Sequence, residues 1–357
     1  MKHPDDGILL VDKGEGETSH GVVKKVRSVL HRGKRYKVGH AGTLDPFATG
    51  LLVILLGQGA KLSRFMMAGE KEYLATLELG IETDTLDPTG RVTAIRDVPN
   101  LSLDHIRDTA NRYEGRIRQT PPVYSAVKYQ GSRAYALARK GVAFKLKERE
   151  ITVHSISIVS VDLPDITMRI RCAGGTYIRS LAADLARDLG TGGRLKTLRR
   201  LKSGLFDVAT AMPSRDILPE SHAGTLLGMA TPLTKALPGM GEIELNGMLA
   251  EKVRLGYQPC WNELACIVEP IHPLFENTEN ETDDGRQMTE DRRRMTDDGK
   301  QMTDDGKQMT EDGRRISVIS DQESFIKLIS GDKLVAIAKK SDGGGGHEKV
   351  KFERVFS

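Results

Sequence analysis

The chain has 357 residues, enough for about two domains of ordinary size, and its 53 Lys and Arg against 49 Asp and Glu give a formal net charge of +4. Residues 281–315 hold 11 acidic and 8 basic side chains, so the rest of the chain carries +7, which suits a polyanionic partner without requiring one. No apolar run approaches the roughly 18 residues of a membrane span, no signal peptide is expected, and three cysteines without metal-ligand spacing favour a reducing cytoplasm.

The first 210 residues alternate between short apolar runs and amphipathic segments. The apolar runs predict strands at residues 7–11, 51–56, 73–79, 151–161 and 166–172. Apolar residues at helical spacing predict helices at residues 19–30, 103–113 and 178–189, the first of them capped by Thr18 or Ser19. This alternation predicts a dense α and β core.

Residues 119–148 have a different texture. They are rich in Arg, Lys and Tyr and have no long apolar period. We therefore expect a loop-and-helix excursion from the core, which a solvated charged loop would equally explain.

After about residue 235 the chain changes again. Residues 242–266 and 315–356 each look like short strands of a small β domain. Between them a Met recurs every seven residues, at 288, 295, 302 and 309. A coiled coil needs two apolar positions per heptad and this repeat has one, so we expect disorder at about 277–315.

The stretch from Val38 to Leu52 is the most informative part of the sequence. It places three glycines and a proline within residues 39–50, just before a buried strand. Pro46 keeps Asp45 out of the α region, so a stiff backbone presents the Asp45 carboxylate. By itself this pattern is typical of a capped turn. Asp84 and Asp87 fall in a separate turn, residues 83–90, so no second carboxylate is expected beside Asp45.

Five segments, in this order and spacing, together resemble the TruB family of tRNA pseudouridine-55 synthases: residues 39–52, 71–74, 119–128, 175–181 and 198–201. The resemblance implies an α+β fold. Residues 1–235 would form a pseudouridine-synthase catalytic core with a mixed, largely antiparallel sheet and flanking helices, in which 119–148 is an RNA-binding insertion. Residues 236–357 would form a small PUA-like β domain, interrupted by the disordered insertion.

The resemblance also implies an activity. The enzyme would be an isomerase that converts uridine to pseudouridine at position 55 in the T-loop of tRNA, on a flipped-out base and without a cofactor or metal. Asp45 matches the catalytic aspartate, which either attacks C1′ or assists a glycal route. Arg179 matches the arginine that pairs with it and would hold its pKa down. Tyr73 matches the tyrosine that stacks on the base.

Further matched residues would bind the substrate. Tyr177 and Leu198 match pocket residues, although ordinary core packing would also explain them, and His40 matches a histidine that enters the RNA loop. The basic residues assigned to the phosphates are Lys128, Arg133 and Arg139, with Arg199, Arg200 and Lys202 extending that surface.

Other functions remain open at this level. An RNA-binding or tRNA-folding factor on the same scaffold, with secondary or lost catalysis, would not need to retain Asp45, Tyr73 and Arg179. A guide-RNA-dependent relative would carry further docking segments. A nucleotide-binding loop at residues 57–61 lacks the required spacing. We expect a cytoplasmic monomer whose partner is the T-arm of tRNA.

Overall fold

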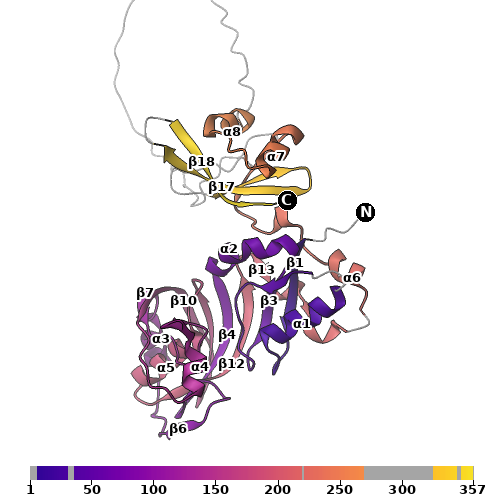
Figure 1. The fold of residues 1–357 in the computed structure, drawn as a ribbon. Helices are drawn as coiled ribbons and strands as arrows, with labels where there is room; N and C mark the ends of the chain where they lie inside the picture. The colour runs from indigo at the N-terminus through magenta and orange to yellow at the C-terminus, as the bar shows by residue number, and fades with distance from the viewer. Residues whose placement is uncertain (1–5, 31–35, 219–220, 269–324, 344–346, 357) are drawn as a thin grey trace, which may run out of the picture. The chain divides into compact units, whose positions relative to one another are not determined.

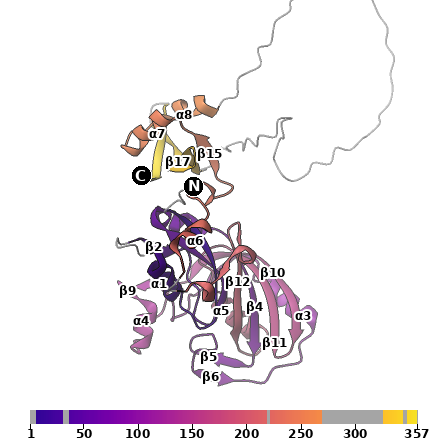
Figure 2. The same ribbon diagram turned by 90° about the vertical axis from the view of Figure 1, so that its right-hand side faces the viewer.

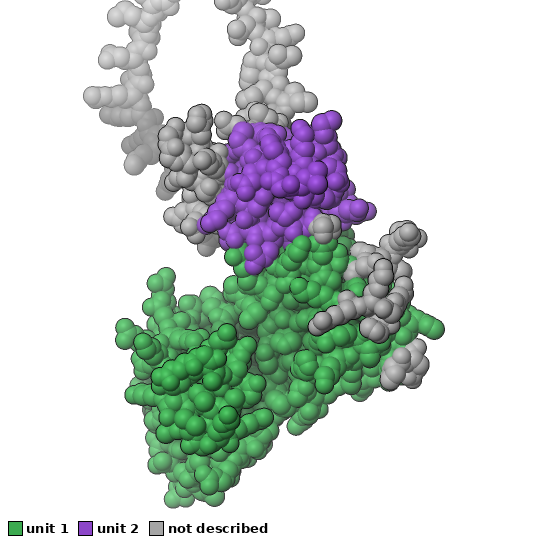
Figure 3. All heavy atoms as spheres, in the orientation of Figure 1, with its two compact units in different colours: residues 1–238 green, residues 239–357 purple. Residues whose placement is uncertain are grey.

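A computed structural model of the chain describes residues 6–30, 36–218, 221–268, 325–343 and 347–356. The chain divides into two compact units, unit 1 at residues 1–238 and unit 2 at residues 239–357, drawn in green and purple in Figure 3. The insertion expected at about 277–315 lies outside the described residues.

Unit 1 is built on a ten-stranded sheet (Figures 1 and 2). Along its main path the order is β14 (Met212–Pro213), β1 (Gly7–Lys13), β3 (Thr49–Leu56), β12 (Gly193–Ser203), β4 (Lys71–Leu79), β11 (Asp165–Cys172), β10 (Arg149–Asp162) and β7 (Gly115–Gln119). β2 (Val38–His40) pairs with β3, and β13 (Phe206–Asp207) pairs with β12. The β1–β14 and β3–β12 pairs are parallel and the other pairs described in this sheet are antiparallel. The α+β class with a mixed, largely antiparallel sheet is therefore confirmed.

Helices α1 (Ser19–Leu30), α3 (Leu103–Asn111) and α5 (Ile178–Asp188) bury their apolar faces in one core with the strands. The Thr18 hydroxyl caps α1 by accepting the Gly21 N–H at 2.9 Å, as the sequence predicts. Shorter helices are α2 (Ser63–Ala68), α4 (Ala134–Arg139) and α6 (Ala223–Gly228). The described part of the unit also contains the 3₁₀ turns η1 (Gly57–Leu62), η2 (Val208–Thr210), η3 (Ser214–Asp216) and η4 (Leu233–Lys235).

Two small hairpins stand apart from the main sheet. One pairs β5 (Ile81–Thr83) with β6 (Val92–Ile95). The other pairs β8 (Lys128–Tyr129) with β9 (Ser132–Arg133) and continues into α4. The second hairpin and α4 form the loop-and-helix excursion expected at residues 119–148.

Strand β12 has no counterpart among the predicted strands. Its pairing with β4 shifts register between Leu195 and Thr197 and again between Arg200 and Lys202. These bulges break the two-residue alternation, so Leu195 and Leu198 are both buried although they are three residues apart. The result is a central strand whose sequence does not alternate.

Unit 2 has its own four-stranded sheet and apolar core. The strand order is β15 (Gly241–Glu244), β16 (Phe325–Ser330), β17 (Lys333–Gly343) and β18 (His347–Val355), with β15 parallel to β16. The strands expected at residues 242–266 are mostly wrong, because α7 (Gly247–Arg254) and α8 (Trp261–Val268) follow β15. The Asn246 side chain caps α7 by accepting the Leu249 N–H at 2.9 Å.

Candidate active site

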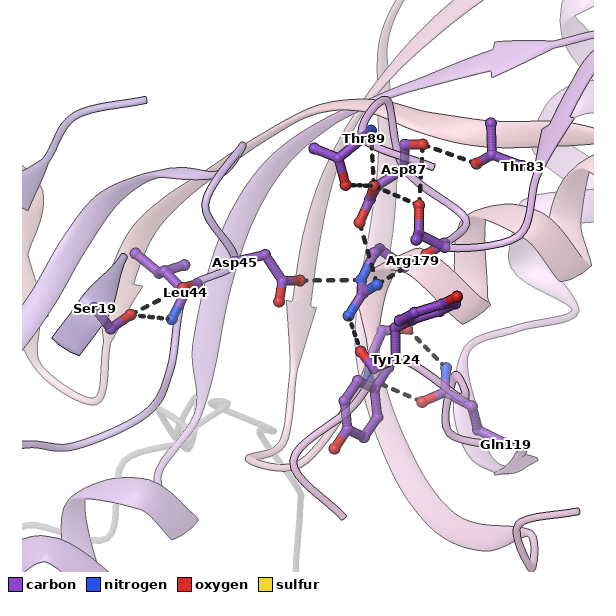
Figure 4. A network of polar contacts seen from close by, with 11 residues as sticks. Ser19, Leu44, Asp45, Thr83, Asp87, Thr89, Gln119, Tyr124 and Arg179 are labelled. Atoms are coloured by element: carbon purple, nitrogen blue, oxygen red, sulfur yellow. Dashed lines mark hydrogen bonds and ion pairs between the residues drawn. The ribbon is translucent and has the colours of Figure 1, made fainter. Parts of the chain in front are cut away.

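Asp45 lies in the loop between β2 and β3, and hydrogen bonds on both sides of Asp45 hold that loop. The Ser19 hydroxyl bonds both the N–H and the carbonyl of Leu44, each at 2.9 Å, which ties the start of α1 to the residue before Asp45 (Figure 4). On the other side, the Pro46 carbonyl accepts the Gly16 N–H at 2.8 Å. The Asp45 carboxylate is therefore presented from an immobilised backbone.

Arg179 stands in the first turn of α5 and its side chain is 5% exposed. Its Nε lies 3.0 Å from Asp45 Oδ2, and its Nη1 lies 3.2 Å from Asp87 Oδ2. The same guanidinium donates to the Thr85 carbonyl at 2.8 Å and to the Tyr124 carbonyl at 2.9 Å. Figure 4 shows the guanidinium between the two carboxylates. The structure places Arg179 in contact with Asp45. That this contact serves catalysis stays a prediction.

Asp87 corrects the expectation that no second carboxylate lies near this pair. Its Oδ1 accepts from the Thr85 hydroxyl at 2.6 Å and from the Thr89 N–H and hydroxyl at 3.0 and 2.6 Å. Leu86 adopts a φ of 61°. This left-handed conformation is energetically unfavourable for a residue with a branched side chain. The strained turn and the three hydrogen bonds to Oδ1 thus orient Asp87 so that its Oδ2 contacts Arg179.

The electrostatics of Asp45 also differ from expectation. Burial raises the pKa of Asp45 above its usual value, Arg179 and Lys13 oppose that rise, and Asp87 adds to it. Arg179 therefore limits the rise but does not bring the pKa below its ordinary range. The Asp45 side chain is 34% exposed, against 5% for Asp87. Of the two carboxylates, Asp45 is the more exposed and therefore the more accessible to a ligand.

A pocket of about 600 Å³ opens at this carboxylate. Its lining includes Asp45, Arg179, Tyr73, Tyr177, Leu198 and Arg139. Figure 3 shows the surface of unit 1 hollowed between the lobe that carries α3, α4 and α5 and the part that carries α1. The structure thus gathers six of the nine predicted site residues around one hollow.

Tyr73 and Leu198 lie on neighbouring strands in the floor of the pocket. Tyr73 on β4 is 8% exposed and Leu198 on β12 is 7% exposed. Burial raises the pKa of the Tyr73 hydroxyl, so it remains neutral at ordinary pH. Both present apolar surface beside the Asp45–Arg179 pair, which suits a planar base.

The prediction that Arg200 lies on the RNA-binding surface is wrong. It is 1% exposed, and its Nε donates to the Leu51 carbonyl at 2.6 Å and its Nη2 to the Gly42 carbonyl at 3.1 Å. Register pairs it with Tyr73 across β12 and β4. Arg200 therefore fastens both ends of the Asp45 loop to the sheet.

Its neighbours do not form a free basic surface either. Arg199 pairs with Asp12 at 2.7 Å, and Lys202 lies 3.8 Å from Glu72. Intramolecular carboxylates thus partner the two cations that were assigned to phosphates.

The predicted site residues that do not line the pocket are Lys128, Arg133 and His40. Lys128 and Arg133 face each other across the exposed β8–β9 hairpin. Arg139, which does line the pocket, places its guanidinium 5.7 Å from the centre of the Tyr135 ring. His40 lies on β2 and is not among the pocket-lining residues; its pKa is lowered by burial and by Arg200 and His20.

Comparisons with known proteins show the family of the chain. A sequence model of the TruB family of pseudouridylate synthases, N-terminal domain, matches residues 27–178. The chain is 43% identical over 254 residues to "tRNA pseudouridine synthase B" of Syntrophus aciditrophicus, covering 71% of this chain and 80% of the relative. The chain belongs to the TruB family. The protein of the same name from Geobacter sulfurreducens is 40% identical over 255 residues, 71% of this chain and 83% of that relative.

Solved structures of proteins with low sequence identity to the TruB-family chain have the same fold. A chain in a Cbf5–Nop10–Gar1 complex aligns with a TM-score of 0.66 at 21% identity, covering 99% of this chain and 86% of that chain. A chain of the archaeal box H/ACA Nop10–Cbf5 complex aligns with a TM-score of 0.63 at 20% identity, over 99% and 87%.

Two kinds of feature are absent from the part of the TruB-family chain that the structure describes. Among these described residues, no group of three or more His, Cys, Asp or Glu side chains is placed to hold a metal ion. No helix there has both the length and the apolar character needed to cross a membrane.

Sequence reasoning missed Asp87, although a signal for it exists. The tetrapeptide Thr-Leu-Asp-Pro occurs at residues 43–46 and again at residues 85–88. Both copies supply a carboxylate to Arg179. No comparable signal marks Arg200 in the sequence, because an arginine among other basic residues is typical of a protein surface.

Proposed function

We propose that this chain isomerises uridine to pseudouridine at position 55 in the T-loop of tRNA, with Asp45 as the catalytic carboxylate. The observation that carries the proposal is the Asp45–Arg179 pair, 3.0 Å between Oδ2 and Nε, at the floor of a pocket large enough for one nucleotide. The printed names of the relatives, tRNA pseudouridine synthase B, supply the substrate class.

The reaction needs few parts. The N1–C1′ bond breaks, the uracil turns within the pocket, C5 bonds to C1′ and loses its proton, and N1 takes up a proton. An ionised Asp45 stabilises positive charge at the sugar, either by attacking C1′ or by assisting a glycal route. Arg179 keeps that carboxylate ionised more often than burial alone would allow. Uridine and pseudouridine are isomers, so atoms balance without a cofactor.

The base must leave the RNA stack to reach Asp45, which costs a few kcal/mol. Tyr73 and Leu198 offset that cost by stacking and apolar contact with the uracil. Lys128, Arg133 and Arg139, on the excursion beside the pocket, bind phosphates of the T-arm. We further propose that the chain acts as a monomer and meets its tRNA in the cytoplasm.

Tritium release tests the proposal. A tRNA transcript labelled with tritium at C5 of uridine loses label when C5 becomes the glycosidic carbon. We expect close to one equivalent released per tRNA, and none when cytidine replaces uridine 55. Tight tRNA binding without release would instead support a binding or folding factor.

A further inference from the structure

The pocket contains a hydroxyl that none of the contacts described above uses. Ser125 lies in the loop between β7 and β8, is 4% exposed and lines the pocket. Its Oγ is buried and has no hydrogen-bond partner among the described residues. Buried hydroxyls are nearly always paired, so an orphan in a pocket points to a group that arrives with the ligand.

The backbone around this hydroxyl is held firmly. The carbonyls of residues 124–126 accept, in order, from Arg179 Nη2 at 2.9 Å, from the Tyr135 N–H at 3.0 Å and from Arg133 Nη1 at 2.6 Å. Three consecutive bonds fix the backbone of this segment, so only rotation about the Cα–Cβ bond of Ser125 moves its hydroxyl. The hydroxyl therefore stays at the pocket wall, within reach of a ligand.

We propose that the Ser125 hydroxyl binds the ribose 2′-hydroxyl of the target nucleotide and so selects a ribonucleotide at this site. This inference rests on the proposed function. Asp45 must lie against C1′, and Arg179 bridges Asp45 to the Tyr124 carbonyl, next to Ser125. Ser125 thus belongs to the wall on the sugar side, and the 2′-hydroxyl is carried by the carbon adjacent to C1′.

The chemistry of the reaction also favours the sugar over the base. The uracil has to turn inside the pocket, so a fixed bond to one of its edges would hold it in a single orientation. The ribose keeps its place while the base turns, and a bond to its 2′-hydroxyl serves substrate and product alike. The 2′-hydroxyl is also the group by which a protein distinguishes RNA from DNA.

A binding cycle tests the contact without turnover. Ser125→Ala is introduced into an Asp45→Asn chain, and affinity is measured for two T-arm stem–loops that differ only in uridine or 2′-deoxyuridine at the target. We expect affinity for the uridine RNA to fall about 2- to 10-fold, the size of one hydrogen bond, and affinity for the deoxyuridine RNA to stay unchanged. An equal loss on both RNAs, or a loss on neither, overturns the proposal.

Two controls separate this contact from structural effects. Thr176 also lines the pocket, but its hydroxyl donates to the Ala173 carbonyl at 3.0 Å, so Thr176→Val should affect both RNAs equally. Ser125→Ala should leave the Tm unchanged or raise it, because no bond within the protein is lost. A lowered Tm would place the partner of Ser125 inside the protein and overturn the proposal.

Turnover by the wild-type chain separates the two claims. If the wild type releases tritium from the uridine RNA and the binding cycle shows no 2′-hydroxyl dependence, only the Ser125 contact is wrong. If the wild type releases none, the proposed function fails, and the assignment of the 2′-hydroxyl falls with it.

Discussion

Arg179 binds two carboxylates that have different surroundings. Asp87 is as buried as Arg179, and its other oxygen is saturated by Thr85 and Thr89. Asp45 is one third exposed and faces the pocket. Asp87 thus fixes the position of the guanidinium, and the guanidinium in turn orients Asp45.

Replacing Asp87 should harm turnover more than RNA binding. Asp87→Asn removes the buried charge that anchors Arg179, and a shift of about 1 Å at a reacting group costs about 100-fold in rate. We expect single-turnover rates to fall about 10- to 100-fold with RNA affinity nearly unchanged. Asp84→Asn is the matched control, because Asp84 lies in the same turn but accepts from the Arg91 N–H. Equal effects of both variants would contradict an anchoring role.

The pH dependence follows from the raised pKa of Asp45. The ionised carboxylate is the active form, so activity should fall as pH drops through that pKa, above the ordinary value of 3.8. Because the negative charge of Asp87 contributes to the rise, Asp87→Asn should move this acid limb to lower pH. Single-turnover rates across pH measure both. A limb that moves to higher pH in the variant would contradict the electrostatic account.

At the scale of elements, the Asp45 loop depends on strand β12. Arg200 holds the carbonyls of Gly42 and Leu51 at the two ends of that loop. Gly50, at a φ of 100°, packs so closely on Arg200 that a Cβ would lie 2.3 Å from its carbonyl oxygen. Strands β3 and β12 therefore pack closely, backbone against backbone, where the loop that carries Asp45 enters the sheet.

Arg200→Met should lower both stability and rate. It leaves two carbonyls without a donor, at about 1–3 kcal/mol each if they stay buried, and it frees the loop that carries Asp45. We expect a loss of about 2–4 kcal/mol in the free energy of unfolding, measured by denaturant titration. Arg199→Met, on the same strand, is the control, because it breaks a half-exposed, bidentate pair with Asp12 but removes no donor from those two carbonyls. Similar losses from both variants would show that Arg200 has no special role.

The basic excursion makes a separate prediction. Lys128→Gln should weaken tRNA binding and reduce the slope of log affinity against log salt by about one. Lys24→Gln, on the exposed side of α1, is the matched control. A salt slope unchanged in Lys128→Gln would remove this hairpin from the RNA contact.

How far the sequence predicts these elements depends on how regular they are. Strands β1, β3, β4, β10 and β11 and helices α1 and α5 were predicted because apolar residues recur along them at strand or helix spacing. β12 escaped because its leucines, Leu195, Leu198 and Leu201, recur at every third residue, and α7 escaped because its apolar face spans two turns. The contacts of Asp87 and Arg200 join residues 92 and 149 positions apart, which no local pattern encodes.

At the scale of the whole molecule, the pocket proposed as the active site belongs to unit 1 alone. Every pocket-lining residue lies in residues 42–200, and the large core and the core of unit 2 share no member. A chain ending at Pro238 should therefore fold and keep its single-turnover rate on a T-arm stem–loop within about threefold, leaving any loss in affinity for full-length tRNA. A folded truncated chain, by circular dichroism, with no turnover would show that unit 2 contributes to the chemical step.

The most direct measurement compares wild type and Asp45→Asn in tritium release from C5-labelled tRNA, with RNA affinity and Tm measured in parallel. We predict release by the wild type and a loss of at least about 1,000-fold in the variant, since both routes proposed for the reaction require the Asp45 carboxylate. RNA affinity should stay within a few fold. The Tm at pH 7 should not fall, because a carboxyl with a raised pKa in the folded state costs stability when ionised. Normal release by Asp45→Asn, with the fold and RNA binding intact, would contradict the account.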